Sequence, residues 1–307
     1  MTEKSATAFS PQSSELSLLY AIVPLLVLLA ATFLACILAY FLVSVWGDDL
    51  SFRTIIRKAT QFFLVLSIFP AMHYLKLNKF DLGFSVRHVF VKQLWQGVGL
   101  GFITLMPVFI VLYILGVNII DESKPWTLFW ISKKLAVELS LALLISLFEE
   151  PVFRGILLTG LNKKMSVKAA IFISAFYYAI LHFLDSKTQI PVQELNLFSG
   201  FRLLEEAFAH LLNPEILSAF FALFAVGVFL GLLRTQMNAS LGLCIGCHAC
   251  WVWQIKLSKD LFNINPSSDY LYLVSSYDGV VGPLVTTWLA LAIAGYFLYK
   301  RLNDRKI

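Results

Sequence analysis

Five ionisable residues lie inside long apolar stretches of the chain. Glu149, Glu150 and Arg154 interrupt the run LLISLFEEPVFRGILL, His182 lies near the end of IFISAFYYAILHF, and His248 lies in LGLCIGCHACWVW. An ionisable side chain at the centre of a membrane-spanning helix costs about 2.5–3.5 kcal/mol on insertion scales. Residues retained at such a cost are candidates for function.

The spacing of the first group assigns different tasks to its two carboxylates. Glu150 and Arg154 are four residues apart, so on a helix they share a face and can pair. Glu149 lies about 100° further round the helix and is free to point into a bundle, where a carboxylate without a matching cation can act as a general base. Pro151 lacks an N–H group and predicts a kink that leaves room for water near Glu149.

A purely structural interpretation of these residues stays open. Glu149, Glu150 and Arg154 can form an ion cluster that only packs helices, and a single membrane histidine is commonly a hydrogen-bonded packing residue. Here, however, two histidines lie on separate helices, and Arg154 pairs with only one of the two carboxylates. This combination favours a functional site over helix packing alone.

The elements that carry these residues must be membrane helices. Of 307 residues, 59% are hydrophobic and only 14% charged, against about 45–50% and about 25% in soluble domains. This composition excludes a soluble enzyme, a disordered chain and a fibrous protein. The modest net charge of +5 does not indicate a nucleic-acid-binding face.

The apolar runs predict about eight spans, because a helix needs about 20 apolar residues to cross the hydrocarbon layer. The first run is too long for a cleaved signal peptide. The predicted spans lie near residues 16–46, 59–75, 94–117, 135–157, 167–184, 214–233, 239–255 and 280–300; seven spans are the alternative if 59–75 is not one.

Basic residues predict the orientation, since Lys and Arg accumulate in cytoplasmic loops. In the eight-span arrangement, segment 76–92, segment 163–168 and the C-terminus are basic and fall on one side, so we expect them and both termini in the cytoplasm. Arg53, Arg57 and Lys58 disagree with this arrangement, because they fall in an outward loop.

Three motifs in order resemble the CPBP family, the CAAX prenyl endopeptidases and bacteriocin-processing or immunity proteins also called the ABI family. The first is E-E-x-x-x-R at 149–154. The second is Tyr178-x-x-x-His182, where the family usually has Phe in place of Tyr. The third is the region 224–252, with Asn238 followed by Ile245-x-x-His248. The resemblance covers roughly residues 140–255.

The resemblance implies an intramembrane glutamic-type endopeptidase. In it Glu149, aided by His182, would activate a water molecule that attacks a peptide carbonyl, and His248 would stabilise the oxyanion. Glu150 and Arg154 would hold the helix in register, with Tyr178 and Asn238 in supporting positions. We expect no cofactor and no metal, although Glu and His are also plausible zinc ligands.

One position departs from the family pattern. The last motif is usually His-x-x-x-Asn or Asp, whose side chain assists the oxyanion, but the fourth residue after His248 is Val252. Loss of one such donor typically costs about 10²–10³ in rate. Asn238 or Trp253 could substitute, and a slow enzyme or a non-proteolytic relative stays open.

A competing motif overlaps the third region. Cys244-x-x-Cys247-His248 is also the c-type haem attachment pattern, and Cys250 extends it towards iron–sulfur spacing. Haem attachment needs a segment outside the membrane, however, and a cluster would need a fourth ligand, for which only Cys36 is left. The alternative is that the cysteines are small apolar residues at which helices approach closely.

We therefore expect an all-α, polytopic transmembrane bundle with a CAAX-protease-like core. Its predicted parts are N-terminal helices (1–130), a catalytic core (131–260) and an outer loop with the last helix (261–307). We expect a multi-pass endopeptidase, in the inner membrane if prokaryotic, that cleaves a membrane-associated protein or peptide and binds no nucleic acid. The rivals are a peptide-binding immunity or scaffold protein, a haem- or cluster-binding protein, and a transporter.

Overall fold

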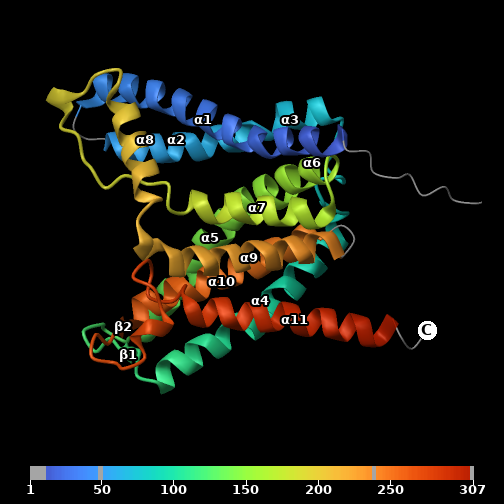
Figure 1. Ribbon diagram of the computed structural model, residues 1–307. Helices are drawn as coiled ribbons and strands as arrows, with labels where there is room; N and C mark the ends of the chain where they lie inside the picture. Colours follow the sequence, from blue (N-terminus) through green and yellow to red (C-terminus); the bar gives the residue numbers. More distant parts are fainter. Residues whose placement is uncertain (1–11, 48–50, 237–239, 305–307) are drawn as a thin grey trace, which may run out of the picture.

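The computed structural model describes residues 12–47, 51–236 and 240–304, and within them the chain is almost entirely helical. Figure 1 shows the long helices side by side, with α4 crossing the others obliquely. The α-helices, in order, are α1 (Gln12–Trp46), α2 (Phe52–Leu66), α3 (Ile68–Leu75), α4 (Arg87–Ile114), α5 (Leu128–Glu150), α6 (Leu158–Asn162), α7 (Val167–Leu181), α8 (Ser199–His210), α9 (Leu217–Gln236), α10 (Leu241–Leu261) and α11 (Pro283–Asp304). A π-helix, η2 (Pro151–Leu157), joins α5 to α6, and the described residues also include the 3₁₀ turns η3 (Val192–Glu194), η4 (Pro214–Ile216) and η5 (Leu271–Leu273).

Each of the eight predicted spans contains a helix, which confirms the helical membrane fold. Four helical segments of the described chain are long and apolar enough to cross a bilayer: Leu19–Trp46, Phe52–Leu75, Arg87–Ile114 and Pro214–Gln236. Val167–Leu181 is apolar but shorter. The complete set of eight spans stays a prediction.

Two short strands depart from the all-α expectation. β1 (Asn118–Ile120) follows α4 and pairs antiparallel with β2 (Phe262–Ile264), which follows α10. Strands of three residues give no readable alternation, and their pairing joins distant parts of the chain, so the sequence did not indicate them. The pair ties the ends of α4 and α10 together.

The basic segments predicted to share one side do meet at one end of the bundle. Lys163 Nζ donates to the Leu75 carbonyl at 2.9 Å, and Arg234 Nη2 donates to the Asp81 carbonyl at 2.8 Å. In Figure 1 this end also holds the last turn of α11, whereas α8 and the β1–β2 pair lie at the opposite end.

The core lies among α4, α7, α9, α10 and α11, where close backbone approach depends on small residues. A Cβ atom on Gly97 of α4 would collide with the Leu243 carbonyl of α10, and one on Gly246 of α10 would collide with the Leu94 carbonyl. Small residues at helix interfaces allow such approach in membranes. These contacts fix α10, and with it His248, against α4.

Candidate active site

The two adjacent glutamates lie at the end of α5, immediately before the wide turn η2. Pro151 begins that segment; its missing N–H cannot continue the α-helical bonding pattern, and the bonding changes there to that of a π-helix. Glu150 is completely buried, whereas the Glu149 side chain is 26% exposed. The two carboxylates thus point into different surroundings, as the spacing predicted.

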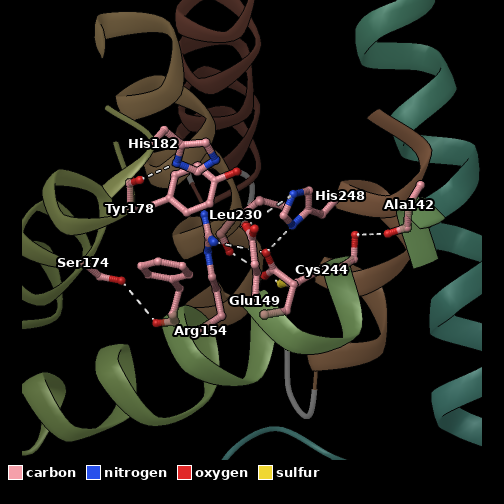
Figure 2. Close-up of polar contacts among 12 residues, drawn as sticks. Ala142, Glu149, Arg154, Ser174, Tyr178, His182, Leu230, Cys244 and His248 are labelled. Atoms are coloured by element: carbon pink, nitrogen blue, oxygen red, sulfur yellow. Dashed lines mark hydrogen bonds and ion pairs between the residues drawn. The ribbon is translucent and has the colours of Figure 1, made fainter. Parts of the chain in front are cut away.

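Glu150 is the centre of a buried polar cluster. Its Oε1 atom accepts a hydrogen bond from Arg154 Nη1 at 3.0 Å and another from His248 Nδ1 at 2.7 Å (Figure 2). The Arg154 guanidinium also lies over the Tyr178 ring, 4.3 Å from its centroid. The ion pair between Glu150 and Arg154, expected from their spacing, is present and reaches a second helix through His248.

His248 therefore presents only one ring nitrogen to the rest of the site. A carboxylate can only accept hydrogen bonds, so the Nδ1 atom that faces Glu150 carries the hydrogen. The other nitrogen, Nε2, lies 3.9 Å from Glu149 Oε2. Glu150 thus orients the His248 ring towards Glu149.

His182, directly after α7, is oriented in a similar way. Its Nδ1 atom lies 2.7 Å from the Tyr178 carbonyl oxygen, which can only accept, so Nδ1 carries the hydrogen. Within the described residues Nε2 has no partner. This arrangement leaves an imidazole nitrogen able to accept a proton.

A cavity of about 250 Å³ joins these groups. Glu149, His182 and His248 all line this cavity. Val252, which stands where the resembled family usually has Asn or Asp, lines it as well. The remaining walls are mainly aliphatic and aromatic side chains from α4, α9, α10 and α11, and the cavity extends to the loop that carries Tyr277 and Asp278. Carboxylate and imidazole groups in such apolar surroundings are suited to acid–base chemistry on a bound ligand.

The structure places most of the predicted site residues together. Tyr178 lines the cavity together with Glu149, His182 and His248, and Glu150 and Arg154 adjoin these residues. Asn238 lies outside the described residues. Trp253, considered as a substitute donor, donates its Nε1 hydrogen to the Leu135 carbonyl at 3.1 Å and is therefore engaged elsewhere.

Sequence reasoning missed further residues on the cavity wall. Tyr277 lies in the loop before α11, a segment without a periodic pattern, and burial raises the pKa of its phenol to about 12, with the nearby Asp278 and Glu149 carboxylates contributing. Thr104 and Lys256 are polar residues within α4 and α10. Thr104 could have been noticed as a polar residue in an apolar span.

The clustered cysteines lie in tight helix packing. Cys244 Sγ lies 3.6 Å from the Leu230 carbonyl, and Gln254 Nε2 lies 3.2 Å from Cys250 Sγ. Cys244, Cys247 and Cys250 are all buried and have free thiols. His248, the histidine of the haem pattern, forms a hydrogen bond with Glu150. These contacts favour the packing interpretation of the cysteines.

Residues 130–254 match a known family, described as type II CAAX prenyl endopeptidase Rce1-like. The matched segment, which carries the candidate site, is similar to this family. This Rce1-like segment contains the predicted catalytic trio, and the match agrees with the resemblance to the CPBP family drawn from the three motifs. No curated protein and no solved structure matches the chain.

Proposed function

We propose that this protein is an intramembrane endopeptidase that cleaves a membrane-associated protein or peptide. The observation that carries the proposal is the position of the Glu149 carboxylate and its lack of a cationic partner in the described part of the chain. This carboxylate has no Lys or Arg partner within the described residues and shares the cavity with the outward nitrogens of two histidines. Glu150, by contrast, is committed to Arg154 and His248.

In the proposed reaction, Glu149 accepts a proton from a water molecule whose oxygen bonds to the scissile carbonyl carbon. The π electrons of the carbonyl move onto its oxygen, which becomes an oxyanion. The C–N bond then breaks as the carbonyl re-forms, and the leaving amine takes the proton from Glu149. His182 Nε2 would help to orient the water, and an imidazolium at His248 would present its Nε2–H to the developing charge.

We propose that this chemistry needs no metal. Within the described chain no group of three His, Cys, Asp or Glu residues is arranged to hold an ion. Zinc, bound by Glu149 and the histidines, is the alternative that a chelator distinguishes.

The Rce1-like match and the apolar cavity support a substrate that lies in or on the membrane. A peptide with a prenylated C-a-a-X terminus is one such substrate, and a small peptide matured during secretion is another. An eight-span arrangement, in the inner membrane if the source is prokaryotic, is part of the same proposal.

Two internally quenched peptides test the proposed function. One ends in farnesyl-Cys-a-a-X and the other is its unfarnesylated counterpart; each is incubated with the purified full chain in detergent, before and after dialysis against EDTA. We expect cleavage of at least one peptide, unchanged by EDTA, with the new ends identified by mass spectrometry.

Other outcomes contradict the proposal in separate ways. Loss of cleavage in EDTA that zinc restores would replace the metal-free mechanism with a metal-dependent one. Binding of both peptides without cleavage would favour the immunity or scaffold protein. A strong Soret absorbance of the purified chain would favour the haem protein.

A further inference from the structure

The proposed hydrolysis creates a negative charge that the site must stabilise. When water adds to the scissile carbonyl, a full charge develops on its oxygen inside an apolar cavity. Donors already in place before the reaction are the most effective way to lower the energy of this state. Each donor on the cavity wall can therefore be judged on two properties. It must have no hydrogen-bond partner already, and its side chain must be held in place by its neighbours.

Several of these donors are already engaged. Trp251 Nε1 donates to Thr104 Oγ1 at 2.8 Å, and the Thr104 hydroxyl donates in turn to the Leu100 carbonyl at 2.7 Å. Lys256 Nζ lies 3.1 Å from a Glu138 carboxylate oxygen. None of these groups can turn to an oxyanion without losing a partner.

The Tyr178 hydroxyl is both free and fixed. The residue is only 2% exposed and lines the cavity, and no described residue forms a hydrogen bond with its hydroxyl. Its ring is held by His182 at 4.6 Å and by Phe153 at 5.1 Å between centroids, with the Arg154 guanidinium over its face. Figure 2 shows the hydroxyl directed towards the space between His182 and His248.

This hydroxyl adjoins the cavity without a partner among the described residues, so a bound ligand can accept its hydrogen bond. We propose that the Tyr178 hydroxyl donates a hydrogen bond to the oxyanion that forms when the water activated by Glu149 adds to the scissile carbonyl. The proposal rests on the proposed function. The phenol keeps its own proton throughout, so it adds no step to the bond changes given above.

Tyr178 would act beside the Nε2–H of His248, and Tyr277 and Trp288 are the rival neutral donors on the same wall. As whole residues they are 44% and 38% exposed, respectively, against 2% for Tyr178. The ring of Tyr277 is held by Phe183 alone among the described aromatic residues, at 5.0 Å between centroids. Tyr178 is the better fixed of the two phenols.

Three Tyr→Phe variants test the proposal with the farnesylated and unfarnesylated peptides. Tyr178→Phe keeps the ring and removes the donor; we expect kcat to fall about 10²–10³-fold and KM to change less than about twofold. Tyr177→Phe is the matched control, because this neighbouring residue on α7 donates to the Ala21 carbonyl at 2.7 Å, away from the cavity. Its kcat should stay near that of the wild type.

The outcomes separate the donor role from its rivals. The proposal is overturned if kcat is unchanged in Tyr178→Phe or if only KM changes. It is also overturned if kcat falls further in Tyr277→Phe than in Tyr178→Phe. If the wild type cleaves neither peptide, the proposed function fails and this inference fails with it. If the wild type cleaves and Tyr178→Phe cleaves equally well, only the inference fails.

A second measurement covers a Tyr178→Phe variant that does not fold. Incorporation of 3-fluorotyrosine at position 178 keeps the shape and the hydroxyl but makes the phenol a stronger donor. We expect kcat to rise while KM is unchanged, and an unchanged kcat would contradict the donor role. Where Tyr178→Phe does fold, a trifluoromethyl ketone analogue of the peptide, which binds as a hydrate, should lose affinity for the variant by the same factor as kcat.

Discussion

Arg154 is the largest fully buried side chain in the described part of the chain, and its charge is matched by Glu150. Water is excluded from both groups, so each depends on the other and on His248. The spacing in the sequence was enough to predict this pair, because residues four apart share one face of a helix. It could not show that His248 joins the pair, since that contact links distant helices.

Replacing Arg154 with Met should therefore destabilise the protein strongly. Loss of one partner leaves a buried charge without compensation, which typically costs about 3–5 kcal/mol. Unfolding of detergent-solubilised variants by denaturant measures the loss.

Arg202→Met provides the control for this prediction. Arg202 also forms an i,i+4 pair, with Glu206 at 3.7 Å, but its side chain is 68% exposed, and such surface pairs contribute about 0.3–0.5 kcal/mol. Equal losses in the two variants would show that burial of the Glu150–Arg154 pair has no energetic importance.

At the scale of elements, the contact between α4 and α10 positions the site. The sequence predicted both helices but not their pairing, because glycine positions alone do not name a partner helix. In the structure the backbones touch at Gly97 and Gly246, and the polar side chain of Thr104 on α4 accepts a hydrogen bond from Trp251 on α10. His248 lies between these two contacts along α10.

Gly97→Val should push the two helices apart. Its added atoms would collide with the backbone at Leu243 and Cys247; such overpacking typically costs about 1–3 kcal/mol, and the displacement of His248 should also lower cleavage. Thermal unfolding and the peptide assay measure the two effects.

Gly99→Val is the matched control, because a Cβ atom at this exposed position of the same helix meets nothing within 4 Å. We expect its unfolding temperature and activity to stay close to those of the wild type. If both valine variants behave alike, the close approach at Gly97 is not what holds α10 in place.

At the scale of the whole molecule, composition predicted a helical membrane protein, and each predicted apolar run contains a helix. Arg53 is one of the basic residues that disagreed with the predicted orientation. It forms an ion pair with Asp185 at 3.0 Å, which offsets its charge. The β1–β2 pair and the loop that brings Tyr277 to the cavity were not predictable, because both depend on contacts between segments far apart in the chain.

The central claim is that Glu149 activates the water that cleaves a peptide bond, and Glu149→Gln tests it most directly. Glu205→Gln, on the exposed face of α8, is the control, and unfolding temperatures establish that both variants are folded. General-base catalysis contributes about 10²–10⁴-fold, so the kcat of Glu149→Gln on the quenched peptides should fall by that factor while Glu205→Gln retains the wild-type rate. A folded Glu149→Gln variant that cleaves at the wild-type rate would contradict the account.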